Sequence, residues 1–384
     1  MRTNNYFWML AAGTALFLTA CHSTEILDQR QEGRISLRTT VSNATKAVSL
    51  TPDYLKEEGF HLTAFENPLT ESNPTKLFEI DLGKDQYKAD GYYVEDYFWG
   101  DQTLYFYAWY PKSEAGALSV DTDHGYAITY IPAADAAQQK DFSIAYNTGD
   151  KEHNASSGVN LNFRHALSQV EIKVNNGSTV GNTVIVKGVK VGNAIKSGTI
   201  SMPLSPTDEA IADDGSNLLT GLWSGNVRTG ADKNIRSYSI IHTNPITITP
   251  GNTQSVMGSG GNWMVVPQVA TDECVWDVTK GGAGESIYMA LLVQLRQGSA
   301  TVFPHSNTPD ADKEGEYAWT AVPIPAGATL ESGKKYTFTL TFIINTGNAG
   351  NLISNGEEVL SHPIKLVVSV DDWVQVPDEG EELQ

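Results

Sequence analysis

Short runs of alternating apolar and polar residues, separated by turn residues, constrain the fold of this chain most. Successive side chains of a β-strand point to opposite faces, so a half-buried strand alternates with a period of two. Runs of this kind include "RISLRTTV", "KLFEIDL" and "KKYTFTLTF". No segment keeps the 3.6-residue period of an amphipathic helix for long, and only residues 133–141 and 205–215 suit a short helical turn. The sequence therefore predicts an all-β chain.

The Gly-, Ser- and Asn-rich stretch "NTGDKEHNASSG" divides these runs into two groups. Turn residues of this kind mark the connections between strands and the boundaries between domains. A chain of 384 residues is long enough to build two cores of ordinary size. We expect an N-terminal β-sandwich over residues 34–157, a C-terminal β-sandwich over residues 158–376 and an acidic tail over residues 377–384.

The first residues resemble a bacterial lipoprotein leader. An apolar run from Tyr6 to Ala20 is too short for a stable bilayer span and has the length of a signal-peptide core. The run ends in "LTAC", which matches a lipobox, and there a signal peptidase cuts before the cysteine and lipid is attached to its sulfur. We therefore expect a signal peptide over residues 1–20, lipidation at Cys21 and a polar tether over residues 21–33.

Charge and cysteine content exclude several classes of protein. The formal net charge is −19, which argues against nucleic acid as a partner and against binding to anionic membrane surfaces. Besides Cys21 the chain has one other cysteine, Cys274, so a lipidated Cys21 leaves no intrachain disulfide. Cys274 lies in a strand-like run and is expected to behave as a small buried hydrophobic residue.

Motifs for catalysis or metal binding are missing from the sequence. The eight histidines are scattered without the spacing of a zinc site, and no Gly-x-Ser-x-Gly elbow or phosphate-binding loop occurs. The acidic loop at Asp310 begins like a calcium loop but carries Ala321 where a bidentate glutamate is required. We expect no enzyme activity, no metal and no cofactor.

Aromatic residues are concentrated in "LYFYAWYP", where both faces of a strand would be apolar. Surface aromatics can bind sugars or partner proteins, but a strand with two apolar faces is more often buried in a core. The sequence favours the core interpretation.

Several short motifs, in order along the chain, resemble the fimbrillin family, also described as Mfa-like or type V pilins. "LNFRHALSQVEIKV" resembles a family signature in which Phe163, His165 and Leu167 are motif positions with a structural role. "TLYFYAWYP", "DFSIAYN", "LESGKKYTFTLTF" and "VDDW" are similar to four further elements of the family.

The resemblance implies two tandem transthyretin-like β-sandwich domains in a precursor exported to the outer membrane as a surface-exposed lipoprotein. A protease then removes the N-terminus together with the first strand, and a donor strand from another subunit fills the groove. On this basis we expect the chain to be a structural subunit of a cell-surface fimbria that supports adhesion. Its partners would be other fimbrial subunits, the outer membrane before processing, and a receptor on a host or bacterial surface.

Three basic residues are candidates for the cut. Lys46 follows the first predicted strand in a polar loop, Arg38 lies inside that strand, and Arg34 precedes it. Exposed loops are the preferred sites of proteolysis, whereas family members favour arginine, so Lys46 and Arg38 rank together ahead of Arg34. The alternating run "PIKLVVSVDDWVQV" is a candidate donor strand.

The sequence leaves open whether the chain is a stalk, tip or anchor subunit. It also leaves a second function open, a surface-exposed glycan-binding lipoprotein that stays monomeric and keeps its lipid.

Overall fold

The computed structural model consists mostly of β-strands with a few short helices, which confirms the all-β prediction. It describes residues 33–41, 50–71, 73–88, 91–112, 119–121, 125–204, 218–225, 234–258, 261–270, 276–277, 282–283, 286–304, 316–344 and 365–372. The helices are short: α2 (Pro52–Glu58), α3 (Lys151–Asn154) and the 3-10 turns η1 (Lys84–Gln86), η2 (Ala136–Gln138) and η4 (Leu218–Leu222). Among the described residues no helix is long and apolar enough to cross a membrane.

The N-terminal part of the chain forms one eight-stranded sheet that closes over its own core. In spatial order its strands are β3 (Lys76–Leu82), β2 (Phe60–Phe65), β6 (Leu104–Tyr110), β9 (Ser143–Gly149), β10 (Val159–His165), β1 (Arg34–Val41), β5 (Gly91–Phe98) and β4 (Tyr87–Lys88). The ring of Phe60 in β2 packs edge to face against Tyr92 in β5, with centroids 5.0 Å apart. Four strands, β6, β9, β10 and β1, separate β2 from β5 in the sheet order. The two halves of the sheet therefore pack face to face as a sandwich.

The C-terminal part is a sandwich of two separate sheets around the largest core cluster. One sheet has the order β16 (Thr253–Ser255), β11 (Ser168–Asn176), β25 (Lys334–Phe342) and β26 (Lys365–Asp372), with β17 (Trp263–Val265) also on β11. The other has the order β15 (Ile235–Ile248), β12 (Asn182–Ile195), β21 (Tyr288–Gln297) and β22 (Ala300–Phe303), with β23 (Ala318–Pro323) on β21.

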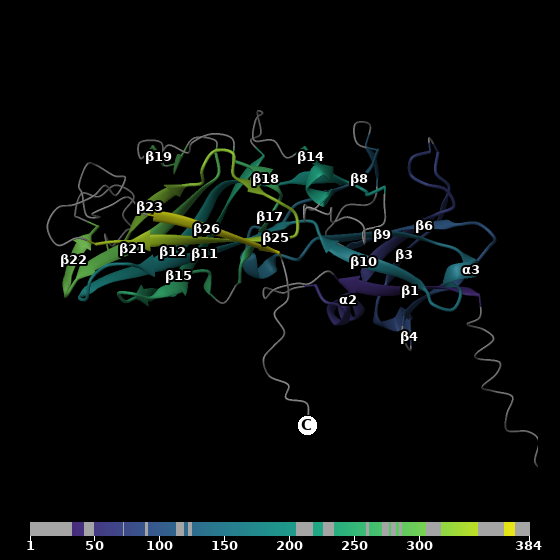
Figure 1. Cartoon of the computed structure of the whole chain (residues 1–384), viewed down its shortest axis with the longest axis horizontal. Helices are drawn as coiled ribbons and strands as arrows, with labels where there is room; N and C mark the ends of the chain where they lie inside the picture. Colours follow the sequence, from purple (N-terminus) through teal and green to yellow (C-terminus); the bar gives the residue numbers. More distant parts are fainter. Residues whose placement is uncertain are drawn as a thin grey trace, which may run out of the picture.

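A third core cluster lies between the two sandwiches, which follow one another along the long axis of the molecule (Figure 1). A small sheet spans this junction with the order β14 (Trp223–Ser224), β13 (Gly198–Ser201), β8 (Gly125–Tyr130) and β7 (Ser119–Asp121). Two further pairs complete the strands: β18 (Gln268–Val269) with β24 (Thr329–Leu330), and β19 (Trp276–Asp277) with β20 (Gly282–Ala283).

The domain boundary predicted between residues 157 and 158 would separate β10 from both strands with which it pairs. β10 runs parallel to β1 and antiparallel to β9, and both of these strands belong to the N-terminal sheet. We propose instead that the N-terminal unit extends through β10. The loop before β10 carried the turn residues, but a turn marks a strand connection and does not by itself mark a change of core.

A largely buried ion pair joins the neighbouring strands β11 and β25 of one C-terminal sheet. Lys335 Nζ lies 2.9 Å from Glu171 Oε2. Burial alone would raise the pKa of the Glu171 carboxyl, but the hydrogen bond and positive charge of Lys335 hold that pKa below its usual value of 4.5.

A lowered carboxyl pKa stabilises the fold above the usual value and loses this effect as the pH falls through the folded-state pKa. We therefore expect wild type to lose about 0.5–1 kcal/mol more free energy of unfolding than Glu171→Gln between about pH 6 and pH 3, a range reduced for screening of a partly exposed pair. Urea unfolding at each pH measures the difference. The exposed Glu95→Gln in β5 is the control and should follow wild type.

Candidate functional site

The strand β1 is the first described strand of the chain and lies inside the N-terminal sheet. It runs parallel to β10, with Leu37 opposite Val159, and antiparallel to β5, with Leu37 opposite Tyr92. Its neighbours therefore come from segments more than fifty residues further along the chain. A strand in this position completes the hydrogen bonding of both neighbours.

Two side chains of β1 fill the N-terminal core. Ile35 and Leu37 are completely buried and belong to the same cluster as Tyr92, Leu161 and Phe163. Burying a side chain of this size stabilises a fold by about 1.5–3 kcal/mol. Without β1, the inner edges of β10 and β5 would be unpaired and an apolar groove would open between them. An edge of this kind is a template for another strand.

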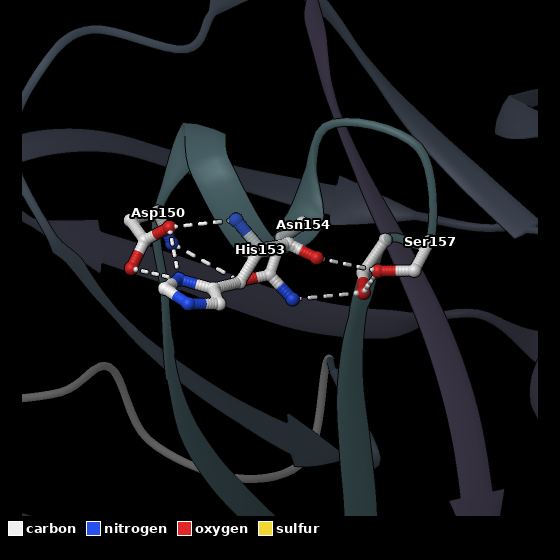
Figure 2. A network of polar contacts seen from close by, with 5 residues as sticks. Asp150, His153, Asn154 and Ser157 are labelled. Atoms are coloured by element: carbon white, nitrogen blue, oxygen red, sulfur yellow. Dashed lines mark hydrogen bonds and ion pairs between the residues drawn. The ribbon is translucent and has the colours of Figure 1, made fainter.

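A compact turn fixes the beginning of β10, one wall of this groove (Figure 2). Asp150 caps α3 by accepting from the backbone N–H of His153, whose ring turns back to the same carboxylate at 2.8 Å. The Asn154 side chain accepts from Asp150 N and donates to Gly158 O, and Ser157 Oγ donates to His153 O. These bonds lower the pKa of Asp150, mainly through the backbone N–H of His153, and raise that of His153.

Gly158 brings this turn against β1. Its φ of +71° lies in the left-handed region, and a Cβ there would lie 3.2 Å from Ser36 Oγ and 3.3 Å from Ser36 O. Glycine therefore allows β10 to start directly beside β1.

The candidate processing residues occupy different environments. Arg38 is exposed but lies within β1, opposite Asn160 of β10. Arg34 starts β1 and lies over the ring of Phe98, with its guanidinium carbon 5.7 Å from the ring centroid. Lys46 and Cys21 lie outside the described residues, as does Cys274.

The family-motif residues lie where the chain leaves the N-terminal sandwich and enters the junction between the two sandwiches. Phe163 belongs to the N-terminal core, whereas Leu167 belongs to the junction cluster. His165 lies between them at the end of β10, and its Nδ1 is 2.7 Å from Asp141 Oδ2, with both side chains almost completely buried. The signature therefore covers residues that lie in the N-terminal core and in the junction cluster.

Asp141 is a residue that sequence reasoning did not single out. Besides His165, its carboxylate faces Ser143 Oγ at 3.4 Å and accepts from the backbone N–H of Leu50 at 3.4 Å. Leu50 is the first described residue after the loop that holds Lys46, and it is 1% exposed. The only signal in the sequence was that "DFSIAYN" begins with this aspartate, and nothing there linked it to His165.

Backbone groups just after His165 complete the junction. Ala166 O accepts from Trp223 Nε1 and from Ser332 Oγ, both at 2.9 Å. Ser168 Oγ donates to Glu331 O at 2.7 Å. Elements from both sandwiches are therefore tied to one short stretch of chain by buried hydrogen bonds, which hold the two units in a fixed arrangement.

The strand β26 is the last described strand and packs loosely. It pairs on one side with β25, from Lys334 opposite Asp372 to Thr341 opposite Lys365. Val367, Val368 and Val370 are 48%, 40% and 53% exposed, so large apolar side chains face solvent on both faces of this edge strand.

The described residues contain no group of three or more His, Cys, Asp and Glu side chains arranged to hold a metal ion. The geometry around β1, β10 and β26 concerns strand pairing and apolar burial. The interactions available at these strands are backbone hydrogen bonds and apolar contacts with other strands.

Comparison with known families agrees with this geometry. The model of the fimbrillin-like family matches residues 45–355, more than half of the chain. The chain belongs to the fimbrillin-like family. A comparison with curated proteins finds no match.

Solved structures with the same fold include a fimbrial protein from Bacteroides vulgatus. It is 14% identical, with a TM-score of 0.55, and the alignment covers 89% of this chain and 99% of that one. A putative cell adhesion protein from Parabacteroides distasonis is 11% identical with a TM-score of 0.49, covering 90% and 98% of the two chains. A fimbrilin from Porphyromonas gingivalis is 10% identical with a TM-score of 0.41, covering 90% and 99%.

In this fimbrillin-like chain, Asp141→Ala should destabilise the fold by about 3 kcal/mol or more, because it removes the carboxylate that faces His165 in a buried site. Denaturant unfolding gives the loss, and a double-mutant cycle with His165→Ala gives a coupling energy above about 1 kcal/mol. The exposed Asp101→Ala should change stability by less than about 0.5 kcal/mol. Additive losses in the cycle would contradict a direct role for the pair.

Proposed function

We propose that this chain is a structural, non-enzymatic subunit of a cell-surface fimbria, assembled by protease-triggered donor-strand exchange and supporting adhesion. The observation that carries the proposal is the position of β1. It is an inner strand of the sheet, and neither of its neighbours, β10 and β5, is adjacent to it in the sequence. Membership of the fimbrillin-like family supports assembly with other fimbrial subunits at the cell surface.

β1 is connected to the remainder of the described fold only through the segment 42–49. A cut in this segment would leave β1 as a peptide held by its two ladders and by the burial of Ile35 and Leu37. A strand from another subunit that offers the same pattern can replace those interactions one for one. This is the physical logic of strand addition, in which backbone hydrogen bonds supply affinity and alternate side chains supply specificity.

The geometry favours Lys46 over the two arginines as the processing site. A protease must bind extended backbone, whereas the backbone of Arg38 pairs within the sheet. A cut after Arg34 would leave Ile35 and Leu37 in the groove, so it would open nothing. Segment 42–49 lies between β1 and the buried anchor at Leu50, and a cut there releases β1 and leaves the anchor in place.

The strand β26 is the proposed donor. Leu366, Val368 and Val370 share one face with a spacing of two, the spacing of Ile35 and Leu37 in β1. Val368 and Val370 are 40% and 53% exposed, so they lose less burial than core residues when β26 leaves its own subunit, whereas Leu366 packs against the C-terminal core. Their insertion into the groove of the next subunit would bury them.

Lipidation of Cys21, and with it attachment to the outer membrane before processing, remains a proposal supported by the "LTAC" motif at the end of the apolar run. A protein that carries two acyl groups is held in a bilayer far more firmly than a protein that carries one. Cleavage near Lys46 would free the subunit from this anchor and open its groove in the same step.

Replacing Lys46 with Gln should block assembly. Mild trypsin treatment of the wild type should release the N-terminal peptide, give a new N-terminus at Ala47 and produce SDS-resistant ladders, whereas Lys46→Gln should stay monomeric. Lys46→Arg is the matched control and should form ladders. Surface protein whose N-terminus is still blocked by lipid on Cys21, with no ladder after trypsin, would contradict the proposal and support the monomeric glycan-binding lipoprotein.

A charge on the inserting face of β26 should also stop assembly. Val368→Asp should leave the monomer folded, since the side chain is 40% exposed, but a carboxylate cannot enter an apolar groove without a large desolvation cost. Val367→Asp, on the opposite face and 48% exposed, is the matched control and should still form ladders after cleavage. Equal ladders from both variants would exclude β26 as the donor.

A further inference from the structure

A small pocket lies on the outer face of the N-terminal sheet, at the far end of the sheet order from β1. Its volume is about 140 Å³. Residues of β2, β3 and β8 line it together with one proline: Thr63, Phe65, Pro74, Lys76, Glu79 and Tyr126. Pockets for drug-sized ligands measure about 300–1,000 Å³, so this one admits only a smaller molecule or one unit of a larger one.

A β-bulge builds one side of the pocket. Ala64 pairs with Phe78 but the next residue, Phe65, pairs with Lys76, which leaves Leu77 as an extra residue in β3. Lys76 and Glu79 are three residues apart and would point to opposite faces of a regular strand. The bulge turns both to the outer face, where Lys76 Nζ lies 2.5 Å from Glu79 Oε2. Bulges commonly re-aim side chains beside functional sites.

Thr63 is one of the lining residues, and its hydroxyl has no hydrogen-bond partner among the described residues. The residue is 1% exposed, and its Oγ1 is one of the buried polar atoms left unsatisfied. An unsatisfied buried hydroxyl costs about 1–3 kcal/mol, so the site gains stability when a ligand supplies the missing partner.

The charges at the pocket compensate one another. Glu79 faces Lys76 and, through Oε1, the Nε2 of His61 at 3.1 Å. The hydrogen bond from Lys76 is the main reason that the pKa of Glu79 lies below its usual value, so its carboxylate is ionised at neutral pH. Opposite these groups are two rings, Phe65 and Tyr126, packed edge to face with centroids 5.6 Å apart.

We propose that this pocket binds one pyranose unit of a glycan. A sugar ring offers hydroxyls that both donate and accept, so one molecule can satisfy Thr63, Glu79 and Lys76 together. Its apolar C–H face can pack against an aromatic side chain such as Tyr126. An anionic ligand would have to compete with Glu79 for Lys76 and would approach a chain of net charge −19.

This inference does not depend on strand exchange, because the uncleaved chain already contains the pocket. The test is an amide chemical-shift titration of the full, uncleaved chain with the methyl pyranosides of glucose, galactose, mannose, fucose, N-acetylglucosamine and N-acetylgalactosamine. We expect at least one to bind with a dissociation constant of about 1–10 mM and to shift resonances at the pocket. Thr63→Val, which keeps the shape of the side chain, should weaken binding about tenfold, the effect of one hydrogen bond.

Thr320→Val is the matched control, since Thr320 is also buried with an unpaired Oγ1 but lies in β23 of the other sandwich. It should bind the sugar as wild type does. The proposal is overturned if no pyranoside shifts the pocket resonances, if Thr63→Val binds as tightly as wild type, or if inorganic phosphate alone produces the shifts.

Discussion

The pairing of β1 with β10 and β5 is the interaction on which the N-terminal half depends. Both neighbours need a strand between them, and the one that fills the place comes from a segment more than fifty residues away from either. The interaction is strong, since two ladders and two fully buried side chains contribute to it, but it is joined to the rest of the fold by one connecting segment. In the proposed exchange, this combination of strong pairing and a single covalent link would allow the strand to be replaced without loss of the remaining structure.

In the proposed exchange the remaining structure would have to stay in place when that strand leaves, and the junction between the sandwiches would supply this support. Asp141 links Leu50, the first described residue after segment 42–49, to His165 at the end of β10. Ala166 and Ser168 then tie the same stretch to the C-terminal sandwich. Because these contacts are buried, they hold the end of β10 in place against the C-terminal sandwich. The fimbrillin-like signature around His165 thus lies where the two cores meet.

The strands and their class could be predicted from alternation alone, and "LYFYAWYP" illustrates why. Leu104 and Phe106 enter the N-terminal core while Tyr107 and Trp109 enter the junction core, so both faces are buried as predicted. The boundary that we propose after β10 could not be found in this way, because turn residues mark strand ends irrespective of the sheet to which the next strand belongs. Helix α2 was missed because it is short, although Thr51 at its N-cap, Pro52 and Asp53 carry the usual signals. The outer pocket was invisible for a related reason, since a bulge at Leu77 changes which side chains share a face and alternation assumes that none occurs.

The net negative charge of the chain affects how copies of it would associate. Copies of a chain with net charge −19 repel one another at long range, so encounter is not assisted by electrostatic attraction. The central residues of β26, from Leu366 to Val370, carry no charge, and its charged residues lie at its ends. In the proposed assembly, short-range backbone pairing and apolar burial would supply the driving force, and both would be available only at an open groove. Repulsion between whole subunits, together with attraction confined to a groove and a neutral strand, would keep intact precursors apart and would restrict growth to subunits that have lost β1.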